Sequence, residues 1–380
     1  MSTIKVSNLQ HASAANPAIV LAADGSATAQ LSSLNGGPLA GARNRIINGD
    51  MRIDQRNNGA AVTPSGGTGY FSCDRWQQWL SQNSKYSIQR STVAPAGFAN
   101  SLLATSLSAY TVLTTDNFAL NQNIEGFNAQ DLGWGTASAS SITLSFWVRS
   151  SLTGTFGGAF SNSAVNRSYP FTYTISAANT WEQKAVTIAG DTTGTWLTDN
   201  GIGIRLWFSI GAGSTYLGTA GSWAGADYRG ATGQTSVVGT SGATFYITGV
   251  QLEPGTVATP FERRSYGQEL ALCQRYALAT NGSCGLAGVA TNTNTIANSF
   301  HFPVFMRSAP TLSTSVTGSA EYSDLYAGNV TAASSSYNLS NANNASSLIS
   351  IAGFTGLTIG RFYSGRPGFG TAVILFSAEL

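Results

Sequence analysis

Charged residues are scarce in this chain. They make up 9% of its 380 positions, and lysine occurs only three times and glutamate only seven times. An average soluble protein carries about 25% charged residues, many of them on helix surfaces. The shortage argues against a helical protein and against a doubly wound α/β enzyme. A formal net charge of +2 without a basic run predicts no nucleic-acid partner. Because no stretch of about 18 apolar residues is present, we expect no membrane insertion.

Histidine and cysteine are also rare, with two and three copies. His11 and His301 stand in no catalytic motif, and two histidines cannot build a three-histidine zinc site. Cys73, Cys273 and Cys284 lack zinc-site spacing, and we expect buried free thiols. The sequence therefore predicts no catalytic site, no metal and no cofactor. Two chemistries stay open, since a pair of acidic residues suffices for glycoside hydrolysis and loop oxygens suffice for calcium.

Residues 1–43 contain no aromatic side chain. We expect short extended pieces at 4–9 and 18–23, separated by Gly and Pro turns. Such a segment cannot bury enough apolar surface alone to offset its ordering entropy. It is therefore either disordered or ordered by neighbouring chains, and we favour an arm used for oligomerisation or attachment. Its first residues form no apolar signal sequence, so we expect synthesis in a cytoplasm.

Alternating apolar and polar residues predict strands throughout residues 44–264. The clearest segments are 141–150 and 203–210, in which every second residue is apolar, as in a half-buried strand. Further strands are expected at the following positions: 45–55, 86–91, 170–176, 182–189 and 243–252. Many strands with one-sided alternation, and no long helical pattern, predict an all-β protein built on an antiparallel sandwich.

One helix interrupts this pattern. Ser265 and Gln268 have the spacing of a capping box, and apolar residues then recur at helical intervals through 265–278. We interpret this segment as a short linker helix. Residues 279–380 return to strand character, best at 300–305 and 371–376, while 332–344 are expected to form loops. We therefore expect residues 279–380 to form a second, smaller β-sandwich.

The first candidate binding residues lie on the polar faces of the two clearest strands. Trp147 is next but one to Arg149, and Arg205 is next but one to Trp207. If the two strands pair, one face presents two indoles and two guanidiniums. Aromatic faces stack on sugar rings, and arginine donates hydrogen bonds to hydroxyl or acidic groups. The alternative is that another subunit or the domain's own loops cover these side chains.

Loop-like sequence carries further candidates for ligand contact. They are Trp223, Tyr228 and Arg229 within 220–235, and Tyr322, Tyr326 and Tyr337 near the end of the chain. Exposed aromatic loops are common recognition sites, and tyrosine offers contact area at low entropy cost. The segment 220–235 could equally be a loop packed over the end of the sandwich.

Four motifs in a fixed order carry a resemblance to a known family. They are Asn44–Arg56 with Tyr70–Trp76, then Ile247–Gly255 with Thr259–Arg264, then Tyr266–Tyr276, and finally Phe302–Pro310. This series resembles tail fibre proteins of tailed bacteriophages, those of cyanobacterial phages in particular. The segment Ile4–Gln10 is similar to the starts of such fibres. Together the motifs bracket nearly the whole chain.

The resemblance implies a virion structural protein and usually a homotrimer. Residues 1–43 would attach to other phage tail or baseplate proteins, 44–264 would form a jelly roll similar to carbohydrate-binding modules, 265–278 would link, and 279–380 would face the host. The family supplies no catalytic residues. The motif residues are instead expected to hold the fold together, with Asp50 or Asp74 paired to Arg52, Arg56 or Arg75. The same structural role is expected of three further motif residues, Asn48, Gln55 and Trp76.

Three functions stay open at this point. The first is a trimeric fibre that attaches the virion to a polysaccharide of the host surface. The second is a purely structural fibre or decoration protein, with the receptor bound elsewhere. The third is a tailspike enzyme that degrades host polysaccharide. A trimer would account for an arm that cannot fold alone and for the low charge, because subunit interfaces are depleted in lysine and glutamate.

Overall fold

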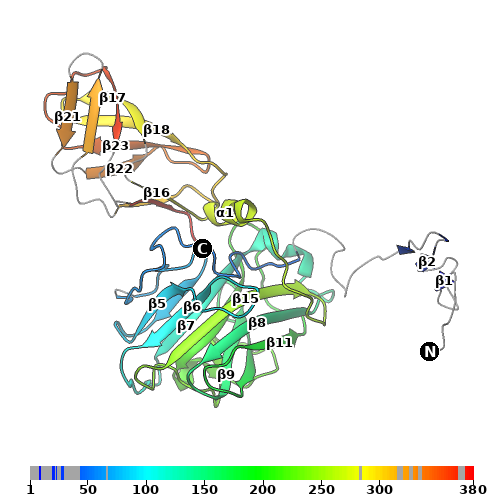
Figure 1. The fold of residues 1–380 in the computed structure, drawn as a ribbon. Coiled ribbons are helices and arrows are strands. Elements are labelled where there is room, and N and C mark those ends of the chain that lie inside the picture. The colour runs from blue at the N-terminus through cyan, green and yellow to red at the C-terminus, as the bar shows by residue number, and fades with distance from the viewer. Residues whose placement is uncertain are drawn as a thin grey trace.

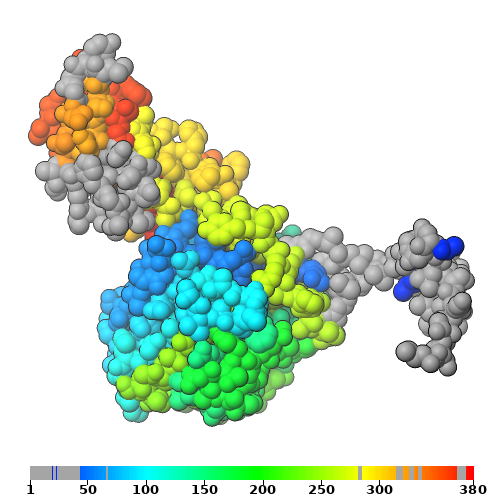
Figure 2. All heavy atoms as spheres, viewed as in Figure 1, coloured from blue at the N-terminus to red at the C-terminus, as the bar shows by residue number. Residues whose placement is uncertain are grey.

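The computed structural model consists of two β-sheet modules joined at a short helix. It describes the residues 8–9, 19–21, 23, 27–29, 43–65, 67–281, 285–314, 320–324, 328–332, 336–366 and 373–380. Figure 1 shows the second module at one end of the first, with the helix α1 between them. The first module is the larger body in the space-filling view of Figure 2. The fold is all-β and antiparallel apart from one short parallel pair of strands, as the sequence predicts.

The first module is a jelly-roll-like sandwich of two five-stranded antiparallel sheets. One, named here the β8 sheet, has the order β11 (Glu182–Ile188), β8 (Ile142–Ser150), β15 (Thr244–Pro254), β6 (Ser101–Ser106) and β5 (Tyr86–Ser91). The other, the β12 sheet, has the order β10 (Ser168–Ile175), β9 (Gly154–Ser161), β12 (Ile202–Ala212), β7 (Asn117–Glu125) and β4 (Gln77–Leu80). The chain crosses repeatedly between the sheets, so neighbours in sequence often lie in opposite layers.

Alternation along the strands places one face of each sheet in the core. In β8, Phe146 and Val148 are fully buried, and in β12 so is Phe208. The ring centroids of Phe146 and Phe208 lie 5.0 Å apart across the sandwich. Each fully buried side chain of this size contributes roughly 1.5–3 kcal/mol. The predicted strands at 141–150 and 203–210 are confirmed, and the residues between the core positions point outward.

Short elements connect these strands. They are the 3-10 helices η1 (Gly126–Asn128), η2 (Gln130–Leu132) and η3 (Ser214–Tyr216), and the parallel pair β13 (Leu217–Gly218) and β14 (Gly230–Ala231). In the N-terminal region the described strands are β1 (Asn8–Leu9), β2 (Ile19–Leu21) and β3 (Ala27–Ala29), which pair in that order. The rest of the predicted arm, with His11, lies outside the described residues.

The second module has its own core between a seven-stranded and a three-stranded sheet. The larger sheet has the order β21 (Gly328–Ala332), β20 (Ala320–Asp324), β24 (Phe362–Arg366), β17 (Leu286–Asn292), β18 (Thr295–His301), β23 (Ser346–Ala352) and β22 (Ser336–Ser340). The smaller has the order β16 (Ala277–Asn281), β25 (Val373–Ser377) and β19 (Thr311–Thr314).

Three of the predicted segments differ from the structure. Residues 45–55 form turns rather than a strand, because Asn48 and Met51 adopt positive φ angles of 57° and 58°. The strand expected at 300–305 ends at His301, since Pro303 follows and has no N–H to donate. Residues 336–340, expected as a loop, form β22 because they pair antiparallel with residues 348–352 of β23. Tertiary pairing there outweighs the weak strand propensity of Ser and Asn.

The predicted helix is present as α1 (Tyr266–Gln274), the α-helix of the described residues. Its capping box is formed as expected, since the Ser265 side chain accepts from the Gln268 backbone and the Gln268 side chain accepts from the Ser265 N–H. The helix starts after the last strand of the first module and ends at the first strand of the second. Within the described residues, no helix is long and apolar enough to cross a membrane.

The motif residues hold the fold together, and their hydrogen bonds reach well beyond the motif itself. Asn48 bonds through its side chain to both backbone groups of Ile53 and to the carbonyl of Asp74. Its own carbonyl accepts the indole N–H of Trp76 at 3.0 Å. The side chains of Asp50 and Arg52 lie 2.5 Å apart, one of the ion pairs that the sequence predicts. These bonds fold 44–56 under the sandwich.

The same motif also closes the junction between the two modules. Arg56 pairs with Asp74 at 3.1 Å and with Glu379 at 2.8 Å. Arg75 pairs with the same Glu379 carboxylate, and its guanidinium lies 3.6 Å from the centre of the Tyr276 ring. Burial alone would lower the pKa of Arg75, but Glu379 together with Tyr276, Tyr70 and Cys273 outweighs burial and raises the pKa above its usual range. The last residues of the chain thus return to the first module, beside the C in Figure 1.

Candidate functional site

The four residues expected to share one binding face, Trp147, Arg149, Arg205 and Trp207, do not form one surface. β8 lies in one sheet and β12 in the other, so the two strands never pair. Trp147 and Arg149 project from the outer face of the β8 sheet, whereas Arg205 and Trp207 project from the outer face of the β12 sheet. The expectation of two indoles and two guanidiniums on one face is wrong. Alternation identifies the outward residues correctly but does not say which sheet they belong to.

The outer face of the β12 sheet is closed by its own chain. Trp207 is fully buried, its indole N–H donates to the Ser161 hydroxyl at 2.9 Å, and Trp79 packs edge-on at 5.2 Å. The guanidinium of Arg229 lies 5.0 Å from the ring centre of Trp207 and 4.5 Å from that of Trp79. Asp227 accepts two hydrogen bonds from Arg229, at 2.9 and 2.7 Å. Neither the Trp207 ring nor the Arg229 charge is left for a ligand.

The other residues predicted near this face are also engaged. Arg205 donates to the Asn123 side chain and the Ser163 carbonyl, and burial lowers its pKa. Tyr228 is half-buried and packs over Gly218, where an added Cβ would lie 2.3 Å from the Tyr228 ring. The alternative interpretation of 220–235, a loop packed over the sandwich, is therefore the one that the contacts favour.

Trp223 belongs to a separate cluster of three indoles. Its ring lies 5.3 Å from Trp134 and 5.4 Å from Trp196, and those two lie 4.7 Å apart, all edge-on. The indole N–H of Trp223 donates to the Ala189 carbonyl at 2.8 Å. A small cavity of about 150 Å³ opens beside Trp134 and Trp196. Because the three rings pack edge-on against one another, this cluster holds the loop 220–235 against the sandwich.

Two of the three tyrosines predicted as contacts in the second module lie on strands rather than in loops. Tyr322, on β20, is fully buried, and its hydroxyl bonds to the Asn298 side chain at 3.1 Å. It is a core residue, so the prediction of a surface contact there is wrong. Tyr337, on β22, is half-buried against the same core. Tyr326 lies outside the described residues.

The outer face of the β8 sheet, in contrast, presents open aromatic side chains. Arg149 stands directly opposite Tyr246 in the neighbouring strand β15, and its guanidinium lies 5.3 Å from the centre of the Tyr246 ring. Trp181, which precedes β11, packs edge-on against Tyr246 at 6.0 Å. These residues and Trp147 are all partly exposed. Figure 1 shows β11, β8 and β15 side by side, which makes this surface continuous.

A β-bulge extends the surface toward the module junction. The register of β15 against β8 shifts between Thr248 and Gln251, and Gly249 has a φ of 59°. An added Cβ at Gly249 would lie 2.7 Å from the Phe98 ring and 3.1 Å from Trp147. Phe98 packs edge-on against Phe261 at 5.3 Å. We call this surface the aromatic face; its members are Phe98, Trp147, Arg149, Trp181, Tyr246, Phe261 and Arg263.

Sequence reasoning identified Trp147 and Arg149 but missed their partners. Tyr246 lies in a segment predicted as a strand, between the inward residues Phe245 and Ile247, so alternation alone could have placed it outward. No sequence signal places Trp181 beside Tyr246. Their contact depends on β8 lying between β11 and β15 in the sheet.

Replacing Gly249 by alanine tests whether the bulge shapes the aromatic face. The left-handed φ costs an alanine about 1–2 kcal/mol, and its Cβ would also push Phe98 and Trp147 apart. Gly242→Ala is a matched control, because Gly242 has a φ of 73° with nothing within 4 Å of an added Cβ. We expect both variants to lose stability in urea unfolding, Gly249→Ala the more because of its added contacts, and only Gly249→Ala to change the near-ultraviolet signal of the tryptophans. Equal spectra would mean that the bulge does not set the ring positions.

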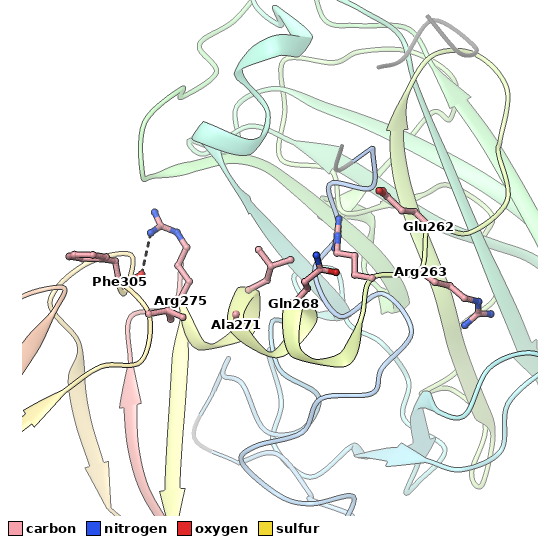
Figure 3. Close-up of a pocket in the computed structure, with 9 residues that line it drawn as sticks. Glu262, Arg263, Gln268, Ala271, Arg275 and Phe305 are labelled. Atoms are coloured by element: carbon pink, nitrogen blue, oxygen red, sulfur yellow. Dashed lines mark hydrogen bonds between the residues drawn. The ribbon is translucent and has the colours of Figure 1, made fainter. Parts of the chain in front are cut away.

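A second hollow lies at the module junction. It has a volume of about 590 Å³ and is lined by the helix α1, by Arg263 and Arg264, and by Val304 and Phe305 of the second module. Figure 3 shows Arg275 and Phe305 on one side and Arg263 on the other, with Arg275 donating to the Phe305 carbonyl. The Phe305 side chain is 69% exposed. Arg264 pairs with Glu269, and Arg275 with Glu125, so both of these charges are compensated within the chain.

The described ranges hold no group of side chains suited to a metal ion. Within them, no three His, Cys, Asp or Glu side chains lie close enough to share a metal ion. Cys73 and Cys273 are buried free thiols, as expected, and burial raises the pKa of both. Cys284 lies outside the described residues. His301 is exposed at the end of β18.

Comparisons with known proteins return likenesses of fold only. No protein-family profile matches the sequence, and no curated protein matches it. Among solved structures, the enzymatically active domain of tailspike protein 4 of bacteriophage CBA120 is similar at 12% identity and a TM-score of 0.31, over 56% of this chain and 21% of that one. This chain thus spans about a fifth of that protein's length.

Two carbohydrate-binding modules are similar over a larger share of their own length. The family 11 carbohydrate-binding module of Clostridium thermocellum, solved with a β-1,3-1,4-mixed-linked tetrasaccharide, matches at 11% identity and a TM-score of 0.27, over 52% of this chain and 98% of that one. TmCBM61, solved with β-1,4-galactotriose, matches at 9% identity and a TM-score of 0.26, over 47% and 88%. At these values the ligand of this chain has to be argued from its own residues.

Proposed function

We propose that this chain is a homotrimeric tail fibre protein of a bacteriophage virion that attaches to a host-surface glycan. The observation that carries the glycan-binding part is the aromatic face. Partly exposed rings of Trp147, Trp181 and Tyr246 flank a guanidinium on the outside of a β-sandwich. Pyranose rings stack on such side chains, and arginine donates to their hydroxyl groups. The order of the sequence motifs supports the virion role.

The trimer part of the proposal is supported by apolar side chains at the surface. Phe305, Tyr266 and Phe127 are each more than half exposed. Tyr266 is the first residue of α1, and Phe305 lines the hollow beside that helix at the module junction. Exposed rings in a protein with few charges favour contacts between subunits. Light scattering of the purified chain is expected to give three chain masses. A monomer at micromolar concentration would contradict this part.

Replacing Trp147 or Trp181 by alanine is the direct test of the glycan site. We expect each to weaken binding to the best ligand on a glycan array about ten- to thirtyfold, or about 1.4–2 kcal/mol. Phe362→Ala is the matched control, because it removes a ring that is 60% exposed in the second module. Both tryptophan variants should keep the stability and oligomeric state of the parent.

Each alternative function predicts a different result. A purely structural fibre would bind neither glycans nor host cells as a purified protein. A tailspike enzyme would shorten the host polysaccharide on incubation. If the tryptophan variants kept full binding and lost the trimer, the aromatic face would be a subunit interface and the glycan site would have to lie elsewhere.

A further inference from the structure

The Arg149 side chain contacts the Tyr246 ring but has no hydrogen-bond or ion-pair partner in the part of the chain that the structure describes. No hydrogen bond or ion pair joins it to any of the described residues, and its Nε atom is buried without an acceptor. Arg229, by comparison, is neutralised by Asp227, and Arg263 donates to the Gly97 carbonyl. Arg205 is held by Asn123 and Ser163. Among these four, Arg149 is the one whose guanidinium makes no hydrogen bond to a described residue, so its Nη donors are left for an external acceptor.

The acidic residues near this part of the sheet are already engaged. Glu182 pairs with Lys184 at 2.6 Å, and Glu253 accepts from the Thr259 hydroxyl and N–H. Glu262 accepts the backbone N–H of Asn44 at 2.7 Å. The positive charge of Arg149 is therefore uncompensated on the aromatic face. The neighbouring ring of Tyr246 also displaces water from one side of the guanidinium, which strengthens a charge interaction there.

We infer that the glycan bound by the aromatic face is an acidic one, with a sugar carboxylate on Arg149 and the sugar ring against Trp147 or Trp181. The inference rests on the proposed glycan-binding function and names its substrate class. A carboxylate matches the fork of a guanidinium and accepts two parallel hydrogen bonds, which a neutral hydroxyl cannot do. Thr248, directly opposite Trp147 on the neighbouring strand, adds a buried hydroxyl that has no hydrogen-bond partner among the described residues.

The test compares carboxylated polysaccharides with neutral counterparts of the same backbone. The probes are polygalacturonate, alginate and hyaluronan, together with methyl-esterified polygalacturonate and the carboxyl-reduced forms of the other two. Binding is measured with the full chain by affinity electrophoresis and titration calorimetry. We expect at least one carboxylated probe to bind about tenfold or more tightly than its neutral counterpart, and this preference to fall as salt rises.

Two substitutions at Arg149 and one control test whether this residue causes the preference for acidic over neutral probes. Arg149→Gln should bind the acidic and neutral forms equally, and Arg149→Lys should keep part of the preference because it keeps the charge. Lys85→Gln is the matched control, since it also removes one positive charge and one cation–ring contact, at Tyr110, away from the aromatic face. It should retain the full preference. Circular dichroism confirms that each variant is folded.

The outcomes separate the inference from the proposed function. Equal binding of acidic and neutral probes by the parent chain, or an unchanged preference in Arg149→Gln, would overturn the inference and leave glycan binding standing. Binding of none of these probes, nor of any glycan on an array, would overturn the proposed function and the inference together.

Discussion

Replacing Glu379 by alanine is expected to detach the second module from the first and to lower the free energy of unfolding by about 3–5 kcal/mol. The Glu379 carboxylate bridges Arg56 and Arg75, and the side chains of these two arginines are 6% and 1% exposed. Arg56 would keep Asp74 as its partner. Arg75 would be left with one carbonyl and the Tyr276 ring, and thus with an uncompensated buried charge. Differential scanning calorimetry should resolve two transitions in place of one.

Two further variants show whether the charge or the shape of Glu379 matters. Glu379→Gln keeps the shape and should lose nearly as much stability, because a neutral amide does not compensate two arginines. Glu321→Ala removes a carboxylate whose one hydrogen bond within the described ranges is to the exposed Asn329 side chain, and it should leave the melting temperature within a degree or two. A single unchanged transition in Glu379→Ala would show that the two modules are held together by other contacts.

Replacing Trp76 by alanine is the second substitution with a large expected effect, a loss of about 3–5 kcal/mol in urea unfolding. The Trp76 ring is fully buried and lies 6.2 Å from that of Phe208. Its indole N–H also satisfies the carbonyl of Asn48, a residue with positive φ. The substitution therefore leaves a cavity under the turn at 44–56 and removes one of two hydrogen bonds to the Asn48 carbonyl, which still accepts the Met51 N–H at 3.2 Å.

Trp76→Phe and Trp181→Ala serve as controls for this effect. Trp76→Phe keeps most of the volume and loses the hydrogen bond, so its cost should be clearly smaller. Trp181→Ala removes a partly exposed indole and should change stability by less than about 0.5 kcal/mol. If Trp76→Ala cost no more than Trp181→Ala, the motif residues would not be the structural support described for them.

Local sequence pattern predicted which residues face outward, but it did not predict which of them meet. Period-two alternation places Trp147, Arg149, Arg205 and Trp207 outside the core, and that assignment is correct. Their grouping depends on strand order, which arises from contacts between residues about a hundred positions apart, such as Tyr246 beside Arg149. The loop residue Arg229 covers Trp207 for the same reason, through a contact that no local pattern encodes.

The motif residues show the converse case. Their order along the chain, and their types, indicated ion pairs within the segment, and Asp50–Arg52 and Asp74–Arg56 are formed. The pairing of Arg56 and Arg75 with Glu379 was not predicted, because a single glutamate near the end of the chain carries no signal of its own. A positive φ at Asn48 was likewise hidden, since the apolar alternation of 45–55 favours a strand.

The separation of Arg75 and Glu379 along the chain has a consequence for synthesis. Arg75 and Glu379 are 304 positions apart, so at about 5–20 residues per second a ribosome reaches the glutamate roughly 15–60 s after the arginine. During that interval Arg56 and Arg75 of the nascent first sandwich lack the Glu379 carboxylate that pairs with them. On a polysome, the last residues of a finished chain could pair with these arginines in the chain behind it. Exchange of C-terminal segments between sister polypeptides is therefore a route of misassembly that this contact opens.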